Sequence, residues 1–143
     1  MRKTFAAIIC APLLFATGVN ASAQTEELDQ MLARMQQMKN DGNAALATFV
    51  AKVRQRCHDP FYLQQIDQEF KLATNSYDRG ARDFNTRREY EENMRYMRAG
   101  AYFSYRLHRD AGECIPDSNP GKARYLADLD EEWANNPPNA RNR

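Results

Sequence analysis

The side chains best suited to bind a metal or to form a covalent cross-link fall in two pairs along the chain. Cys57 is followed directly by His58, and His108 lies six residues before Cys114. Two cysteines and two histidines are the ligand types of a tetrahedral zinc site, but zinc sites usually separate paired ligands by about two to four residues. The adjacent first pair lacks this spacer. The spacing therefore favours a disulfide bond between Cys57 and Cys114.

The first 23 residues predict the compartment in which that bond forms. Two basic residues precede an apolar run over 5–19, and small residues at 21–23 suit cleavage before Gln24. This is the pattern of a secretory signal peptide, and its removal also takes away Cys10, the third cysteine. We therefore expect a mature protein in the periplasm or secreted, where an oxidising environment joins the two remaining cysteines.

A basic and aromatic run, RYMRAGAYFSYRLHRDAGEC, occupies residues 95–114. On a helix with 100° per residue, its arginines and its large apolar side chains separate onto two sides. The broader apolar side includes Tyr96, Met97 and Leu107, and we expect it to face the core. The narrower basic side carries the candidate partner-binding residues, which are Arg88, Arg95, Arg98, Tyr102, Arg106 and Arg109.

Two interpretations of this basic side stay open. It is either a solvated surface whose arginines pair with neighbouring acids, or a contact surface for an acidic partner. Guanidinium groups make bidentate contacts with carboxylates, and tyrosine adds a ring for stacking. Arginine outnumbers lysine fourteen to four after the predicted cleavage. That bias favours binding, because lysine would meet a need for charge alone.

The sequence lacks the motifs of the common enzyme classes. It has no GxSxG, no HExxH, no phosphate-binding glycine loop and no calcium-binding loop. Adjacent carboxylates such as Glu91 and Glu92 point apart on a helix. We therefore expect a protein without catalytic activity and without a cofactor. The contrasting class is a helical-bundle carrier of haem or a metal, with His108 and a methionine of the first helix as haem ligands.

Helical periodicity dominates the chain after the signal peptide, and no strand of alternating polarity is apparent. The first apolar stripe runs from Leu28 to Cys57. It keeps one phase through NDGN at 40–43, which favours a single long helix over a break at Gly42.

Two sequence signals predict where the next helices begin. Asp59 is placed to cap a second helix that has Pro60 in its first turn. Thr86 and Glu89 have the spacing of a capping box at the start of a third helix. We expect the third helix to end before Gly112, because glycine often terminates helices.

A short fourth helix is predicted after a loop, capped by Ser118 or Asn119 and packed over the bundle. Its apolar side carries Leu126, Leu129 and Trp133. The fold class is therefore all-α, an up-down-up three-helix bundle with a short fourth helix and one disulfide. Its domain organisation is a signal peptide over 1–23, a helical domain over 24–134 and a disordered tail over 135–143.

The charge balance restricts the classes of partner. The chain has 20 basic and 19 acidic residues, and loss of Arg2 and Lys3 with the signal peptide would leave 18 against 19. A net charge near zero predicts no binding to nucleic acid. After the signal peptide, no segment is apolar enough to insert stably into a membrane. We expect the partner to be a protein or another envelope macromolecule with an acidic surface.

Two segments, CHDPFYLQQIDQEF from Cys57 and YRLHRDAGEC ending at Cys114, together resemble the LprI-type lysozyme-inhibitor family of small exported helical proteins. The family pattern has a cysteine before a Leu-Asp helix start, and later an aromatic residue and Arg-Asp just before a second cysteine. The corresponding positions are Cys57, Ile66, Asp67, Tyr105, Arg109, Asp110 and Cys114. Tyr105 stands where the family usually has tryptophan, and Gly112 is an additional residue. The resemblance implies inhibition by binding, which agrees with a non-catalytic inhibitor, immunity factor or secretion accessory.

Overall fold

The computed structural model describes the backbone of residues 10–136 and the side chains of residues 23–136. This part of the chain is all-helical and contains no strand, as predicted. Its four helices are α1 (Cys10–Arg56), α2 (Pro60–Gly80), α3 (Arg87–Glu113) and α4 (Lys122–Asn135). Residues 1–9 of the predicted signal peptide and 137–143 of the predicted tail lie outside the described residues.

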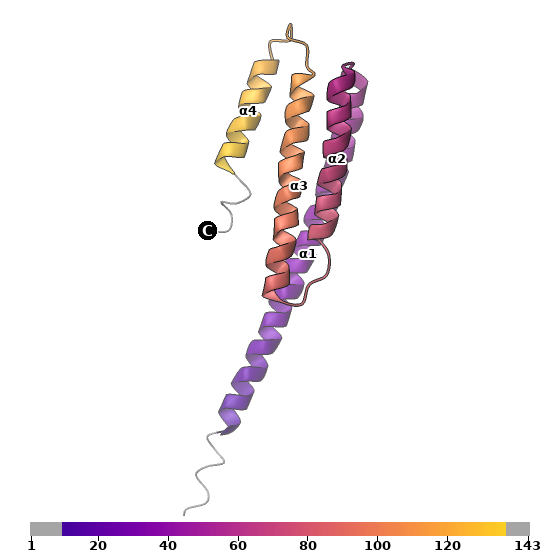
Figure 1. Cartoon of the computed structure of the whole chain (residues 1–143). Coiled ribbons are helices and arrows are strands. Elements are labelled where there is room, and N and C mark those ends of the chain that lie inside the picture. The colour runs from indigo at the N-terminus through magenta and orange to yellow at the C-terminus, as the bar shows by residue number, and fades with distance from the viewer. Residues whose placement is uncertain (1–9, 137–143) are drawn as a thin grey trace, which may run out of the picture.

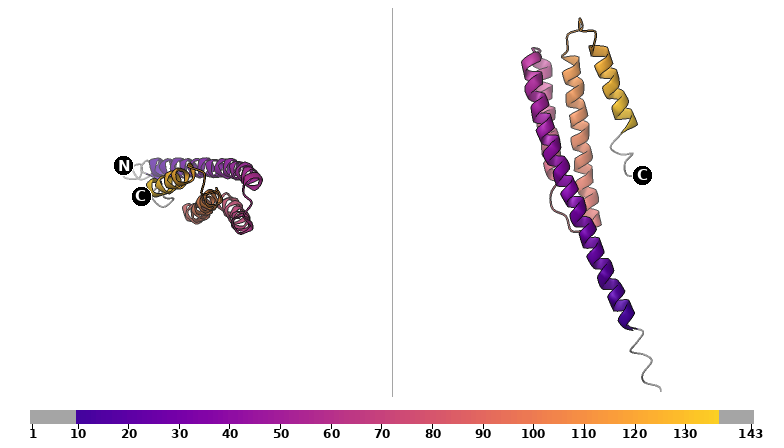
Figure 2. Two further views of the ribbon diagram at one scale, coloured as in Figure 1. Left: turned by 90° about the horizontal axis from the view of Figure 1, so that it is seen from above. Right: turned by 180° about the vertical axis from the view of Figure 1, so that it is seen from behind.

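The molecule is elongated because α1 is much longer than the other helices. α1 lies beside α2 and α3 from about Glu27 onward, whereas its first third extends beyond them (Figures 1 and 2). α4 lies on the flank of α3. No helix within the described residues combines the length and apolar character needed to cross a bilayer.

The prediction of one continuous first helix is confirmed, since α1 passes through Gly42 without a break. The predicted starts of α2 and α3 are also confirmed. The Asp59 side chain accepts a hydrogen bond from the Phe61 backbone N–H at 2.9 Å. Thr86 and Glu89 form the reciprocal bonds of a capping box. Each cap satisfies backbone donors that the first helical turn leaves unpaired.

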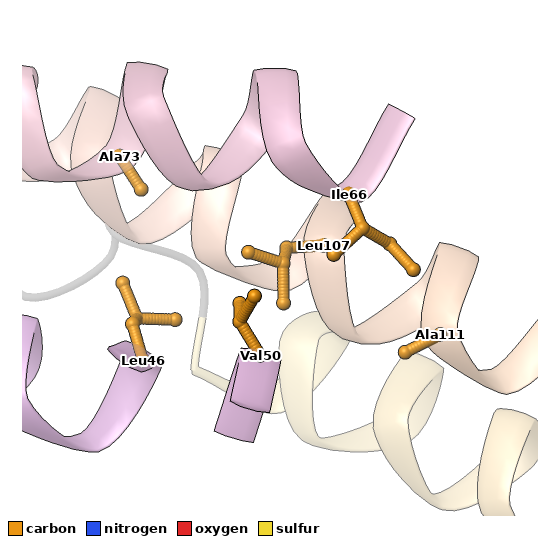
Figure 3. Packing of buried hydrophobic residues seen from close by; sticks show 6 residues of the cluster. All are labelled: Leu46, Val50, Ile66, Ala73, Leu107 and Ala111. Carbon is orange, nitrogen blue, oxygen red and sulfur yellow. The ribbon is translucent and has the colours of Figure 1, made fainter. Parts of the chain in front are cut away.

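The core is a narrow seam where one side of each of α1, α2 and α3 converges. Figure 3 shows two residues from each of these helices pointing toward one another. They are Leu46, Val50, Ile66, Ala73, Leu107 and Ala111. A second buried cluster, of Met35, Phe84 and Met97, packs at the end of the core near the α2–α3 loop. Val50 and Ala111 are additions to the positions predicted from helical periodicity.

Contacts between the helices pair residues in opposite chain order. From α1 to α2, Gly42 lies against Tyr77 and Arg54 forms an ion pair with Asp67 at 2.7 Å. Between α2 and α3, Gly80 lies against Met97, and Glu69 faces Arg106. Residues with increasing numbers along one helix therefore contact residues with decreasing numbers along the next.

The predicted disulfide between Cys57 and Cys114 is present, with the two Cα atoms 5.6 Å apart. The predicted end of α3 is wrong, because the helix continues through Gly112 to Glu113. The glycine is needed there for a close approach: a Cβ atom would lie 2.7 Å from side-chain atoms of both Tyr125 and Leu126 of α4.

The predicted cap of α4 is also wrong. Gly121 occupies the N-cap position and makes no side-chain cap. Instead, the Asn119 side chain accepts a hydrogen bond at 2.9 Å from the backbone N–H of Gly121, the N-cap residue itself. Asn119 therefore orders the loop that leads into α4.

The Tyr77 ring packs between glycines of two other helices. A Cβ atom at Gly42 of α1 would lie 3.5 Å from the ring, which is an ordinary contact distance. A Cβ atom at Gly100 of α3 would lie only 2.7 Å from it. The ring cannot retreat from α3 without moving into α1, so the spacing of the three helices depends on Gly100.

We expect the same substitution at these two glycines to have opposite effects. Gly100→Ala should lower the free energy of unfolding by about 1–3 kcal/mol, because the new methyl group overpacks the Tyr77 ring. Gly42→Ala should raise it by about 0.5–1 kcal/mol, because alanine restricts the unfolded chain and fits the site. Urea unfolding followed by circular dichroism measures both. Equal effects at the two positions would contradict this packing.

Candidate functional site

The basic side of α3 contains two arginines that make no ion pair with any described residue, Arg95 and Arg98. With Tyr102 they follow the spacing i, i+3, i+7, which places all three on one face of the helix. Tyr102 is 42% exposed. We call Arg95, Arg98 and Tyr102 the arginine strip.

α4 borders the arginine strip through Trp133. The indole ring stacks on Tyr105, with centroids 4.6 Å apart and an angle of 14° between the planes. The same indole lies 6.0 Å from the Tyr102 ring. Trp133 remains half-exposed. The strip thus has two arginines without an ion pair to a described residue, and its third member, Tyr102, lies close to Trp133 of α4.

Arg109 of the predicted set attaches α4 to α3. Its guanidinium donates to both carboxylate oxygens of Asp130 at 2.6 Å, and the Tyr105 hydroxyl donates to the same carboxylate at 2.8 Å. Hydrogen bonds from Tyr105 and Arg109 hold the pKa of Asp130 below its usual value. Arg109 therefore contributes to the fold, although it is only half-buried.

Arg106 of the predicted set faces an acidic pair at the α2–α3 contact. Its Nε lies 3.5 Å from Oε1 of Glu69, whose side chain is only 7% exposed. Oε2 of Glu69 is buried and has no hydrogen-bond partner among the described residues. Burial, and then the neighbouring Asp110, raise the pKa of Glu69 from 4.5 to about 8, against the opposing charge of Arg106.

The protonation state of Glu69 follows from this arrangement. Near neutral pH the carboxyl group is protonated, so its hydroxyl becomes a donor for the Asp110 carboxylate. The positive charge of Arg106 then balances the one negative charge that remains, that of the Asp110 carboxylate. Arg106 also donates a hydrogen bond to the Tyr102 hydroxyl at 3.3 Å. Glu69 was not among the residues predicted from the sequence, although its spacing of three and four residues from the buried Ile66 and Ala73 places it on the core side of α2.

The remaining predicted residue, Arg88, is highly exposed and pairs with Glu92 one turn later at 3.4 Å. The structure also changes the assignment of Tyr96. We predicted it in the core wall, but it is 41% exposed, and the Arg79 guanidinium lies over its ring at 5.7 Å. Arg79 belongs to α2, so only the tertiary arrangement reveals this pair. Four of the six candidates, Arg88, Tyr102, Arg106 and Arg109, therefore have contacts within the fold.

The residues proposed for metal or haem are engaged in other contacts. Each cysteine sulfur is bonded to the other, which leaves no thiolate ligand. The His108 ring stacks on Phe49 with centroids 4.1 Å apart, and its Nδ1 lies 2.7 Å from the Ser104 carbonyl oxygen. Among residues 23–136, no three His, Cys, Asp or Glu side chains are grouped to hold a metal ion.

The positions that resemble the LprI-type pattern lie mainly in contacts that maintain the fold. Asp67 pairs with Arg54 of α1. Tyr105 and Arg109 bind Asp130 of α4. The resemblance therefore concerns residues that hold the helices together, and the arginine strip lies outside it. Comparison of the chain with protein-family models, curated proteins and solved structures gave no match.

Proposed function

We propose that this protein is exported by a cleaved signal peptide and acts in the cell envelope by binding an acidic macromolecule without catalysis. The observation that carries the proposal is the arginine strip. Unpaired guanidinium groups beside exposed aromatic rings are typical of residues that dominate binding energy at protein interfaces. The other arginines of α3 have partners within the fold, so Arg95 and Arg98 are the ones left to bind an external carboxylate.

The proposed scaffold is an up-down-up bundle of α1, α2 and α3, with α4 on its flank. The opposite chain order of the contacts between successive helices supports this arrangement. The disulfide supports it too, because it links the C-terminal end of α1 to that of α3. A rigid bundle presents the strip with little loss of conformational entropy on binding.

The partner class that we favour is a protein, and the proposed roles are inhibitor, immunity factor or secretion accessory. The resemblance to the LprI-type family makes a lysozyme the first partner to test. Lysozyme-type enzymes use carboxylates in catalysis, which gives cationic side chains a chemically suitable target. Inhibition of muramidase activity by the purified protein is the direct measurement.

Charge reversal should show whether the partner binds the arginine strip or another part of the surface. We expect Arg95→Glu with Arg98→Glu to weaken capture of the envelope partner at least about tenfold, because each change replaces attraction with repulsion. The matched control is Arg34→Glu with Arg82→Glu, which alters the net charge equally at exposed arginines on α1 and in the α2–α3 loop. Quantitative pull-down from envelope extract compares the two proteins.

Two outcomes would contradict the proposal. Capture that is equal for the strip variant and the control would show that the strip is not the contact surface. A Soret absorption band, or stoichiometric metal in protein purified from the periplasm, would instead support the haem or metal carrier.

A further inference from the structure

A hollow of about 360 Å³ lies at the end of the molecule where the disulfide joins α1 to α3. Its walls come from α1, α3, α4 and the loop that connects α3 to α4. They are mainly apolar and include Phe49, Val53, Ala111, Ile115, Pro116 and Tyr125. This volume is within the range of about 300–1,000 Å³ that is usual for small-molecule sites. The hollow lies apart from the arginine strip.

Two cations, Lys52 and Arg56, line one side of this hollow. They are four residues apart on α1, so their side chains project from the same face. Both are exposed, and neither forms an ion pair with a described residue. Two like charges at this spacing repel each other, and an anion between them would relieve that repulsion.

Asp117 of the loop and Glu113 at the end of α3 are paired with another cation. Lys122 binds Asp117 at 2.7 Å and lies 3.8 Å from Glu113. The same ammonium group donates to the Glu113 carbonyl at 3.1 Å. Glu113 and Asp117 are thus engaged with a third cation, Lys122.

The walls of the hollow are held in place before any ligand arrives. The disulfide fixes α1 against the end of α3. The Tyr125 hydroxyl donates to the His108 carbonyl at 3.2 Å, which fixes α4 against α3. Preformed walls lower the entropic cost of binding.

We propose that this hollow binds a small amphiphilic anion, a molecule with one acid group on an apolar chain or ring, such as a medium-chain fatty acid. The apolar part occupies the hollow, where burial removes it from water. The acid group lies at the rim between the Lys52 ammonium and the Arg56 guanidinium. This site is independent of the proposed partner-binding strip.

Calorimetric titration with decanoate, kept below its micelle concentration, tests the site on the purified protein. We expect saturable binding with one decanoate per chain, and at least about tenfold weaker binding of decanol, which has the same chain without the charge. Lys52→Gln with Arg56→Gln should weaken decanoate binding about tenfold. Ile115→Trp should also weaken it, because the indole fills the hollow while both charges remain.

The matched control is Arg34→Gln with Lys71→Gln, which removes one arginine and one lysine elsewhere on the surface. Equal losses in this control and in the Lys52 and Arg56 variant would overturn the proposal, as would equal affinity for decanoate and decanol. Binding to vesicles of anionic phospholipid without binding of monomeric decanoate would also overturn it, and would identify a membrane-surface contact instead. Circular dichroism checks that each variant is folded.

Discussion

Replacing both cysteines, Cys57→Ala with Cys114→Ala, is expected to lower the free energy of unfolding by about 4 kcal/mol. The disulfide closes a loop with a sequence separation of 57 residues, and without it the unfolded chain regains the entropy of that loop. The loss is large for this protein because its core is a narrow seam. For a domain of this size it corresponds to a fall in Tm of roughly 15–20 °C.

Thermal and urea unfolding with and without a reducing agent provide the control. Reduction of the wild-type protein should reproduce the stability of the double variant, while the variant itself should be insensitive to the reductant. A double variant within about 1 kcal/mol of the wild type would mean that the packed helices alone maintain the fold.

Glu69 should make the protein less stable as the pH rises from about 5 to 8. Its pKa is 4.5 in the unfolded chain and about 8 in the folded one, so between these values the folded protein binds more protons. Stability then falls with rising pH, by up to about 1.4 kcal/mol per pH unit, and the loss is complete above the folded pKa. We expect a total loss of about 3 kcal/mol, measured by urea unfolding across this range.

Glu69→Gln should remove most of this pH dependence. The neutral amide still donates to Asp110 but cannot ionise, so at pH 8 the variant should be about 2–3 kcal/mol more stable than the wild type. At pH 5 the two proteins should be similar. Glu91→Gln, an exposed change on α3, is the matched control and should retain the wild-type profile. A wild-type stability that stays level or rises between pH 5 and 8 would show that Glu69 is not protonated in the fold.

The parts of the fold that the sequence predicts well depend on local interactions. Asp59 caps α2 through the backbone N–H two residues along, and Thr86 with Glu89 forms a cap within one turn. The disulfide was predictable for a different reason, since only two cysteines remain after the predicted cleavage and they end helices at the same side of a bundle. Gly112 shows the limit of local reasoning. Its role is set by the close approach of α4, which lies in a later part of the chain.

The candidate site was less predictable because its state depends on contacts between helices. Periodicity places Arg95 and Arg109 on one side of α3, and both look equally free in the sequence. The structure distinguishes them, since Asp130 of α4 binds Arg109 across 21 positions of the chain. Glu69 likewise looks like an ordinary polar residue until Arg106 and Asp110 of α3 are placed against it.

The position of the disulfide also has a mechanical consequence. α2 and α3 lie between the two cysteines, whereas α1 precedes the first cysteine and α4 follows the second. A tension applied to the two ends of the chain would therefore reach the two cysteines and pass directly through the sulfur–sulfur bond. α1 and α4 could be drawn out under such a load, while α2 and α3 would remain a closed, unstretched unit.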